Sequence, residues 1–261
     1  MKTLKRGGTL DLKAVITPDL IKVWGDIPAD VKEWTSRYAH PDPVGLFGDA
    51  LLLALEEGGV TVRGEARLER GVSGGVTLAT LSTPILDSLI PINTHSNNAV
   101  ADQLFLKSGA DGVGAGNRSG GSAAALKALT QLGLEAEAYK QVDGSGLSRN
   151  NRISARQIVT LLDAVVCRGD VGSEAFMNSL ALAGESGTLA ERMNGTVADS
   201  MVRAKTGFIA GTSALSGVAM TDDERFFCFS VLVEYPALAG LNRQVWKPMQ
   251  DGICEAIVRG P

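Results

Sequence analysis

The chain has 261 residues, of which 44% are hydrophobic but only 5% aromatic, so aliphatic side chains must fill most of its core. Its 25 lysines and arginines against 29 aspartates and glutamates give a net charge of -4, which argues against a nucleic-acid-binding surface. The two histidines and the cysteines Cys167, Cys228 and Cys254 form no metal-binding or disulfide pattern. We therefore expect no metal site, no cofactor and buried free thiols.

The N-terminal residues alternate between polar and apolar side chains. This alternation predicts two short strands, 9–17 and 20–27, with a turn at Pro18. The basic start of the chain is not followed by the apolar segment of a signal peptide, because residues such as Asp11 and Lys13 interrupt it. No uncharged apolar window approaches the length of about 18 residues that indicates a membrane span. From these residues alone we expect neither an export signal nor a span.

A helical apolar period follows at residues 43–57 and stops at Gly58 and Gly59, which is typical of a helix end. The next residues, 60–69, predict a strand. Residues 83–107 predict two helical segments around a polar break at 93–98.

Residues 121–133 predict a further helix, with Ser122 as a possible N-cap. The glycine-rich stretch before it, 107–121, lacks the glycine spacing of a dinucleotide-binding loop, because Asn117 and Ser119 occupy the required positions. We therefore set aside nucleotide binding.

The C-terminal half predicts a loop at 142–154, then a helix at 155–168 capped by Ser154. Three successive strands and a final helix follow, at 199–208, 212–220, 226–234 and 242–259. In the final helix the apolar residues Val245, Met249, Ile253 and Ile257 are spaced by four, and we expect this face to lie on the sheet.

The strand at 199–208 contains Lys205, Thr206 and Gly207. An exposed strand with a solvated lysine accounts for this tripeptide. The alternative is a binding edge, on which the ammonium and the hydroxyl hold a carboxylate while the glycine lets a substrate backbone approach. The tripeptide alone does not separate the two.

Two further segments can likewise be explained either by local structure or by a binding site. Ser96 and Asn98 precede an apolar helical run, so they are either part of a helix cap or polar groups at the mouth of a cleft. The run 143–148, Asp-Gly-Ser-Gly-Leu-Ser, has the composition of a tight loop, but this explanation does not account for its order.

Taken together, these motifs resemble a known family. Lys-Thr-Gly and Ser-x-Asn are two of the three motifs of penicillin-binding proteins and serine β-lactamases. The segments 42–64, 143–151 and 182–193 resemble the class C, low-molecular-mass type, which comprises D-alanyl-D-alanine carboxypeptidases and endopeptidases of peptidoglycan metabolism. The resemblance implies a β-lactamase/transpeptidase-like α/β (α+β) fold, with an antiparallel sheet flanked by helices and a helical subdomain.

The resemblance also implies roles for individual residues. Ser96 would relay a proton between the lysine beside the nucleophile and the leaving amine, and Asn98 would bind the acyl-side amide of the substrate. Lys205 would supply positive charge and orient Ser96. Thr206 would hold the terminal carboxylate of D-Ala-D-Ala, a peptidoglycan stem ending.

The next residues of the strand would contact the substrate as well. The backbone N–H of Phe208, just after Gly207, would be one oxyanion-hole donor. Many relatives have a hydroxyl side chain at the position of Phe208, so this departure leaves the strength of carboxylate binding open. Ser145 would line the cleft or, together with Asp143 and Ser148, shape the loop.

The third family motif, Ser-x-x-Lys, does not occur in the 261 residues, because no serine or threonine is followed three positions later by lysine. Without this activated nucleophile we expect the chain alone to have no carboxypeptidase activity and to form no acyl-enzyme with penicillin. We further expect residues 1–27 to be the last strands of an inserted domain and residues 28–261 to form an incomplete transpeptidase-like domain, with the N-terminal portion missing.

An incomplete domain would expose a sheet edge, so we expect a complementing N-terminal fragment, self-association or a longer parent protein. The alternative functions are a non-catalytic relative that binds peptidoglycan or a partner protein, and a decayed product without activity. The family implies the periplasm or cell envelope, whereas a true start at Met1 implies the cytoplasm. The sequence does not distinguish carboxypeptidase from endopeptidase, nor does it give the oligomeric state.

Overall fold

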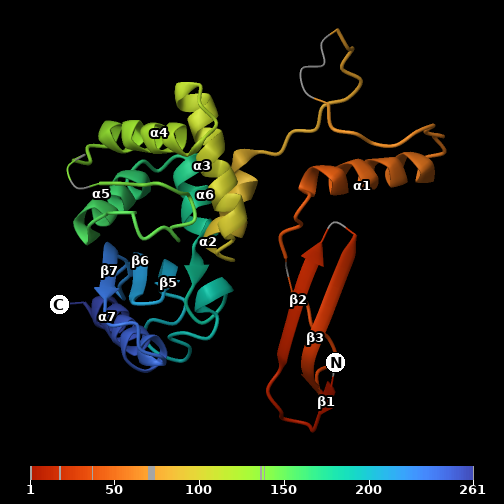
Figure 1. The fold of residues 1–261 in the computed structure, drawn as a ribbon. Helices are drawn as coiled ribbons and strands as arrows, with labels where there is room; N and C mark the ends of the chain where they lie inside the picture. The colour runs from red at the N-terminus through yellow and green to blue at the C-terminus, as the bar shows by residue number, and fades with distance from the viewer. Residues whose placement is uncertain are drawn as a thin grey trace. The chain divides into compact units, whose positions relative to one another are not determined.

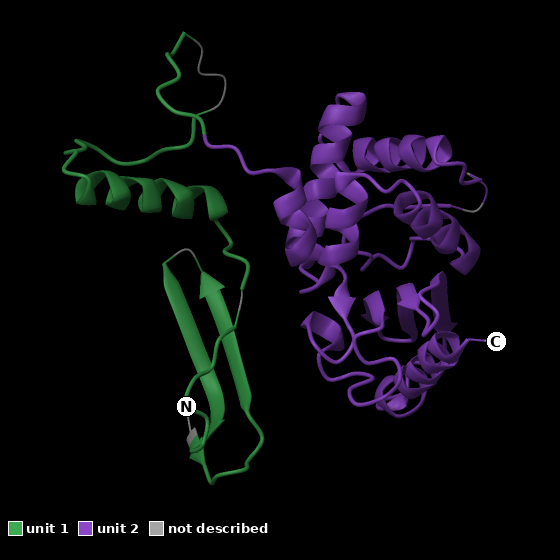
Figure 2. Ribbon diagram, turned by 180° about the vertical axis from the view of Figure 1, so that it is seen from behind, with its two compact units in different colours: residues 1–80 green, residues 81–261 purple. Residues whose placement is uncertain are grey.

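The structure is a computed structural model that describes residues 2–17, 19–36, 38–69, 74–135, 137 and 139–260. Its internal contacts divide the chain into two compact units, Met1–Thr80 and Leu81–Pro261 (Figure 2). The domain boundary predicted between residues 27 and 28 falls inside the first unit. The assignment of residues 1–27 to an inserted domain remains a prediction.

The first unit contains a three-stranded sheet in the order β1-β3-β2, formed by β1 (Lys2–Leu4), β2 (Asp11–Thr17) and β3 (Leu20–Pro28). Strands β2 and β3 pair antiparallel from Asp11 opposite Asp26 to Thr17 opposite Leu20. Both strands were predicted, and the structure confirms them because the period-two pattern suits a hairpin with one partly covered face. The predicted turn residue Pro18 lies outside the described residues.

Helix α1 (Pro43–Glu57) also follows the prediction. Asp42 caps its start by accepting a hydrogen bond from the backbone N–H of Gly45 at 2.9 Å, and Gly58 follows its end. The strand predicted at 60–69 is wrong, because these residues have no strand conformation and pair with no strand in the described part of the unit. A strand-like composition produces a strand only where a partner supplies the hydrogen bonds.

The second unit begins with a group of helices beside the sheet (Figure 1). In chain order, the helices are η1 (Ile85–Ser88), α2 (Leu89–Asn93), α3 (Asn98–Val113), α4 (Arg118–Gln131), α5 (Ala155–Val166) and α6 (Val171–Ser179). The two predicted segments around the break at 93–98 are confirmed, as is the Ser154 cap of α5, which forms a capping box with Gln157. Helix α6 was not predicted.

Helix α4 starts three residues before its predicted start. Asn117 is the cap and accepts a hydrogen bond from Gly120 N at 2.9 Å, whereas Ser122 bonds the Gln141 carbonyl oxygen at 2.5 Å and is not the cap. The glycines of this stretch let α3 and α4 touch, since a Cβ on Gly109 would lie 2.5 Å from Gly121 N. Close helix packing therefore explains the glycine-rich composition.

The second unit also contains a four-stranded antiparallel sheet in the order β4-β5-β6-β7. Its strands are β4 (Ala181–Leu182), β5 (Val202–Ile209), β6 (Thr212–Met220) and β7 (Phe226–Glu234), and the last three were predicted. β6 pairs with all eight residues of β5 and all nine of β7. On one face of the sheet lies α7 (Lys247–Arg259), and α5 covers the other (Figure 1).

The buried face of the final helix differs from the prediction. Val245 and Met249 are 41% and 37% exposed, whereas Gln250, Cys254 and Val258 are fully buried against the sheet. Val245 lies in η3 (Asn242–Trp246), a short π-helical turn before α7, so it does not continue the face of α7. Met249 lies within α7, but the buried face is centred one residue further along, on Gln250, Cys254 and Val258. The apolar spacing correctly predicted a helix, but it did not predict which face of the helix packs on the sheet.

The three thiols have different environments. Cys254 is buried as expected, whereas Cys228 is half-buried and Cys167 is exposed, so the expectation of three buried thiols is wrong. Within the described ranges, no helix is both long and apolar enough to cross a membrane.

Candidate active site

The structure brings Lys205 and Ser96 into contact across 109 residues of sequence. Val202 and Ala204 of β5 are buried in the core beneath α7, so the alternation of a strand points Lys205 to the opposite face. There the Lys205 Nζ donates to Ser96 Oγ at 2.8 Å and to the Thr206 carbonyl oxygen at 2.8 Å. The lysine is thus a directed group rather than a solvated surface charge.

Ser96 lies in the tight turn between α2 and α3. Its φ of +53° is in the left-handed region, which a serine adopts only when the surrounding structure imposes it. Backbone hydrogen bonds fix the turn: His95 N donates to Ile90 O at 3.3 Å, and Asn97 N donates to Pro91 O at 2.9 Å. The backbone on both sides of Ser96 is therefore tied to α2.

Asn97, not Ser96, caps α3. The Asn97 side chain accepts from Val100 N at 3.2 Å, which satisfies one of the unpaired N–H groups at the start of the helix. The capping explanation for this segment therefore applies to Asn97. It leaves the Ser96 hydroxyl free to bond Lys205.

Burial lowers the pKa of Lys205 from its ordinary value, because desolvation disfavours the ammonium form. Among the described residues, Lys205 has no ion-pair partner within 4.0 Å that would oppose this effect. At a given pH, a larger fraction of this lysine is therefore neutral, and able to accept a proton, than of a surface lysine.

One edge of β5 is open beside this pair. The Val202 carbonyl oxygen accepts from Ala183 N at 2.9 Å on the β4 side, and backbone groups two residues apart in a strand point the same way. The backbone groups of Thr206 and Phe208 therefore face this same edge. Strand β4 reaches only as far as Ala204, so no described strand pairs with the edge beyond that point.

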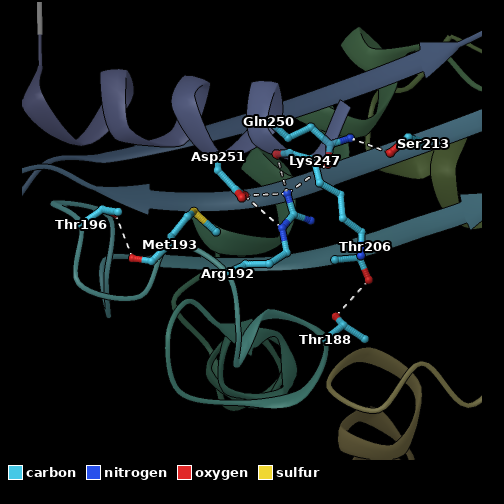
Figure 3. A network of polar contacts seen from close by, with 9 residues as sticks. All are labelled: Thr188, Arg192, Met193, Thr196, Thr206, Ser213, Lys247, Gln250 and Asp251. Carbon is cyan, nitrogen blue, oxygen red and sulfur yellow. Dashed lines mark hydrogen bonds and ion pairs between the residues drawn. The ribbon is translucent and has the colours of Figure 1, made fainter. Parts of the chain in front are cut away.

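The residues along the open edge differ in their side-chain contacts. Thr206 lies on the opposite side of the strand from Lys205 and its hydroxyl donates to the hydroxyl of Thr188 at 2.9 Å (Figure 3). The Phe208 side chain is 61% exposed. Gly207 lies opposite Ala214, and a Cβ there would be 3.1 Å from the Ala214 methyl group. Gly207 therefore leaves this part of the strand without a side chain.

Among the described residues, two members of the predicted site, Asn98 and Ser145, form no hydrogen bond with Ser96 or Lys205. Asn98, the first residue of α3, is exposed, and its side chain forms no hydrogen bond with another described residue. The backbone N–H of Ser145 is held by Asp102 Oδ1 at 2.8 Å, so α3 positions this part of the 143–151 loop. A Cβ on Gly144 would be 2.2 Å from the Ala101 carbonyl oxygen, so the glycine permits this close contact.

Asp143 shapes the rest of the loop. Its carboxylate accepts from Gly146 N at 2.9 Å, Ser148 N at 2.7 Å and Asn151 Nδ2 at 2.8 Å. The Arg149 side chain then donates to the Ala210 carbonyl oxygen at 2.7 Å, in the turn between β5 and β6. The loop therefore joins the helices to the end of the strand that carries Lys205.

The sequence reasoning assigned no role to Thr188 or Arg192. Both lie between β4 and β5 in the 183–200 loop, with Thr188 in its short 3-10 helix η2 (Gly187–Leu189), and within a segment singled out only for its resemblance. Arg192 anchors the loop to α7 through Asp251 at 2.6 Å and Gln250 at 3.1 Å, and Gln250 donates to Ser213 on β6 at 3.1 Å (Figure 3). This network fixes the loop from which Thr188 reaches Thr206.

A family profile and the sequences of curated proteins both match this chain to D-Ala-D-Ala carboxypeptidases. The profile of the D-Ala-D-Ala carboxypeptidase 3 (S13) family matches residues 10–252. A D-alanyl-D-alanine carboxypeptidase from Actinomadura sp. (strain R39) is 36% identical over 227 residues, which cover 80% of this chain and 40% of that protein. The chain thus spans well under half the length of this curated relative.

Solved structures show the fold. Penicillin binding protein 4 (dacB) from Haemophilus influenzae superposes with a TM-score of 0.73 at 21% identity, covering 94% of this chain and 57% of that one. The TLA-3 extended-spectrum beta-lactamase superposes with a TM-score of 0.52 at 18% identity, covering 68% of this chain and 64% of that one. The predicted α/β (α+β) fold of the β-lactamase/transpeptidase type is confirmed.

Proposed function

Because the chain belongs to the D-Ala-D-Ala carboxypeptidase 3 (S13) family, we propose that its second unit forms one side of a serine-type peptidase site for peptidoglycan stem peptides. The observation that carries the proposal is the 2.8 Å contact between Lys205 and Ser96 beside the open edge of β5. A peptide ending in D-Ala-D-Ala would lie along this edge as an added strand. Its terminal carboxylate would be drawn to the positive charge of Lys205.

In this site Ser96 relays a proton from the lysine of the Ser-x-x-Lys element to the leaving amine, with Lys205 fixing the direction of the Ser96 hydroxyl. The backbone N–H of Phe208, on the open edge, donates to the developing oxyanion. Asn98 binds the acyl-side amide, for which its exposed and unbonded side chain is free. Thr206 contributes to carboxylate binding by exchanging its bond to Thr188 for one to the substrate.

The nucleophile lies outside these residues in this proposal. The sequence has no Ser-x-x-Lys element, and acyl transfer through a covalent intermediate requires such an activated serine. The chain alone therefore binds the substrate weakly and does not cleave it. A segment that carries Ser-x-x-Lys, in the same parent protein or in a complementing fragment, completes the enzyme in the cell envelope, where stem peptides are found.

Two measurements on the purified chain test this proposal. Titration with an N-acetylated peptide ending in D-Ala-D-Ala, followed by NMR, should shift the amide signals of β5, and Lys205→Met should abolish the shift. Incubation with the same peptide should release no D-alanine, and a fluorescent penicillin should give no stoichiometric covalent band within minutes. Rapid D-alanine release would contradict the inactivity of the chain alone, and the absence of any shift on β5 would contradict the site itself.

A non-catalytic role as a peptidoglycan-binding or partner-binding relative is the second candidate. The open β5 edge with a free Asn98 supports binding without chemistry equally well. Adding a fragment that supplies Ser-x-x-Lys separates the two candidates. Restored D-alanine release indicates the peptidase, and unchanged binding without release indicates the binding protein.

A further inference from the structure

We propose that Ser96 and Lys205 form a serine–lysine dyad in which Ser96 is itself a nucleophile toward small activated electrophiles. The resemblance placed Lys205 beside Ser96 but assigned Ser96 only a relay role, and no lysine near Ser96 along the chain pointed to a nucleophile. In the structure the lysine is present in space, 2.8 Å from the hydroxyl. Serine–lysine pairs of this kind are among the variants of the serine–base constellation.

The geometry around Lys205 suits a proton acceptor. A neutral amine keeps two N–H groups and one lone pair. One N–H can keep the bond to the Thr206 carbonyl oxygen, which lies 2.8 Å away, and the lone pair can then accept the hydroxyl proton of Ser96. The two existing partners of the lysine therefore fit its neutral form without rearrangement.

The position of Ser96 suits a nucleophile. Its left-handed φ of +53° places it on a strained turn directly before a helix, and the residue is only partly buried. Helix α3, 16 residues long, begins at Asn98 just after this turn. The unpaired N–H groups and the positive end of the helix dipole favour negative charge that develops nearby.

Charged or titratable residues lie on β5, on the Ser96 turn and on the segments that follow or join them: Arg203 on β5 itself, His95 next to Ser96, Asp102 on α3 and Arg149 in the 143–151 loop. Asp102 accepts two backbone N–H groups of the loop, and Arg149 donates to the carbonyl oxygen of Ala210. Desolvation is the cause of the lowered pKa of Lys205, which increases the fraction of neutral amine at a given pH.

The reaction with an alkyl fluorophosphonate probe shows the expected chemistry. The Ser96 Oγ attacks phosphorus, the Oγ–P bond forms as the P–F bond breaks, and fluoride leaves. The hydroxyl proton passes to the lone pair of Lys205, which becomes an ammonium. Such a probe carries no carboxylate and needs no placement along β5, so its reaction is independent of stem-peptide binding.

Intact-mass spectrometry of the purified chain after incubation with the probe tests the dyad. We expect one phosphonyl group per chain, and peptide mapping should locate it on Ser96. Ser96→Ala should remove the label, whereas Ser108→Ala on α3 should leave it unchanged. Lys205→Arg, which keeps a cation near Ser96 but removes the base, should slow labelling by about 100-fold, the low end of general-base effects.

The pH profile adds a readout that a merely structural lysine would not give. The labelling rate should rise with pH and level off below the ordinary lysine pKa of about 10.4. Labelling mapped to another residue, equal labelling of folded Ser96→Ala, or a rate that rises without levelling off overturns the dyad. If Ser96→Ala does not fold, peptide mapping of the labelled wild-type chain still shows whether the phosphonyl group is on Ser96. Failure of labelling leaves the proposed stem-peptide site untouched, and failure of peptide binding leaves the dyad untouched.

Discussion

Arg192→Met should destabilise the second unit strongly. The Arg192 side chain is only 8% exposed, and its Nη2 lies 2.6 Å from the Asp251 carboxylate. It also donates to Gln250 Oε1 at 3.1 Å and to the Lys247 carbonyl oxygen at 3.2 Å. Methionine keeps much of the apolar stem but removes the counter-charge of Asp251, the donor to Gln250 Oε1 and the second donor to the Lys247 carbonyl oxygen.

The expected loss follows from the burial of the pair. Removing one partner of a buried ion pair lowers the free energy of unfolding by about 3–5 kcal/mol. Asp251 is 22% exposed and recovers some hydration, so we expect a value near the lower limit, about 3 kcal/mol. Urea unfolding followed by circular dichroism measures this difference. A double-mutant cycle with Asp251→Asn should give a coupling energy of about 1–3 kcal/mol.

Lys107→Met is the matched control. Lys107 pairs with Asp111 at 2.5 Å within α3, but the two side chains are 63% and 62% exposed. Exposed pairs at this helical spacing contribute about 0.3–0.5 kcal/mol, so the control should change stability little. If Arg192→Met and Lys107→Met lower stability by the same amount, burial of the Arg192 network does not hold the loop to α7, and the reasoning fails.

Four further changes test other parts of the second unit. Gly217→Ala should lower the urea midpoint, at a loss of about 1–3 kcal/mol, because the new Cβ would lie 2.1 Å from a β5 carbonyl oxygen. Asp143→Ala removes the acceptor of three hydrogen bonds, so unfolding free energy should fall by about 2 kcal/mol or more and limited proteolysis should cut the loop. Burial raises the pKa of Cys254 to about 12, so at pH 8 a thiol reagent should modify exposed Cys167 in the folded chain but Cys254 only in denaturant. The pKa of Lys205 is lower in the folded than in the unfolded chain, so between these two values the unfolded chain binds more protons. The free energy of unfolding should therefore rise with pH through that range. Lys205→Met should flatten this rise when unfolding is measured in urea at several pH values.

Elements with strong local signals could be predicted from the sequence. Helix α1 ends at the glycines that predicted its end, and Ser154 caps α5 as expected. Strands β6 and β7 have their predicted bounds. In each case the deciding interaction, a cap, a glycine stop or a hairpin partner, lies within a few residues of the element, so the sequence contains it directly.

Features that depend on distant partners could not be predicted. Gln250 is fully buried on α7 because Arg192 and Ser213 satisfy its amide group, so a polar residue occupies a position that apolar spacing would exclude. Thr188 has no local pattern that marks it, since its role arises from a hydrogen bond to Thr206 on another element. Residues 60–69 show the converse, a segment of strand-like composition that pairs with no strand in the described part of the chain.

The candidate site was predicted only in part. Lys205 and Ser96 were placed in one site by resemblance to a family, not by any spacing along the chain. The structure adds the reason for their contact: Asn97 takes over the helix cap, which releases Ser96, and the core positions Val202 and Ala204 turn Lys205 toward it.

The cost of this arrangement argues that it is functional. A partly buried lysine without an ion-pair partner destabilises the fold, and a serine at φ +53° adds backbone strain of about 1 kcal/mol or more. A structural contact would be better served by an apolar residue on β5 and a glycine in the turn. Strain and desolvation that coincide on two residues in direct contact are typical of sites that act on a ligand. Lys205→Met should therefore retain or increase the stability of the chain at neutral pH while it abolishes both stem-peptide binding and Ser96 labelling.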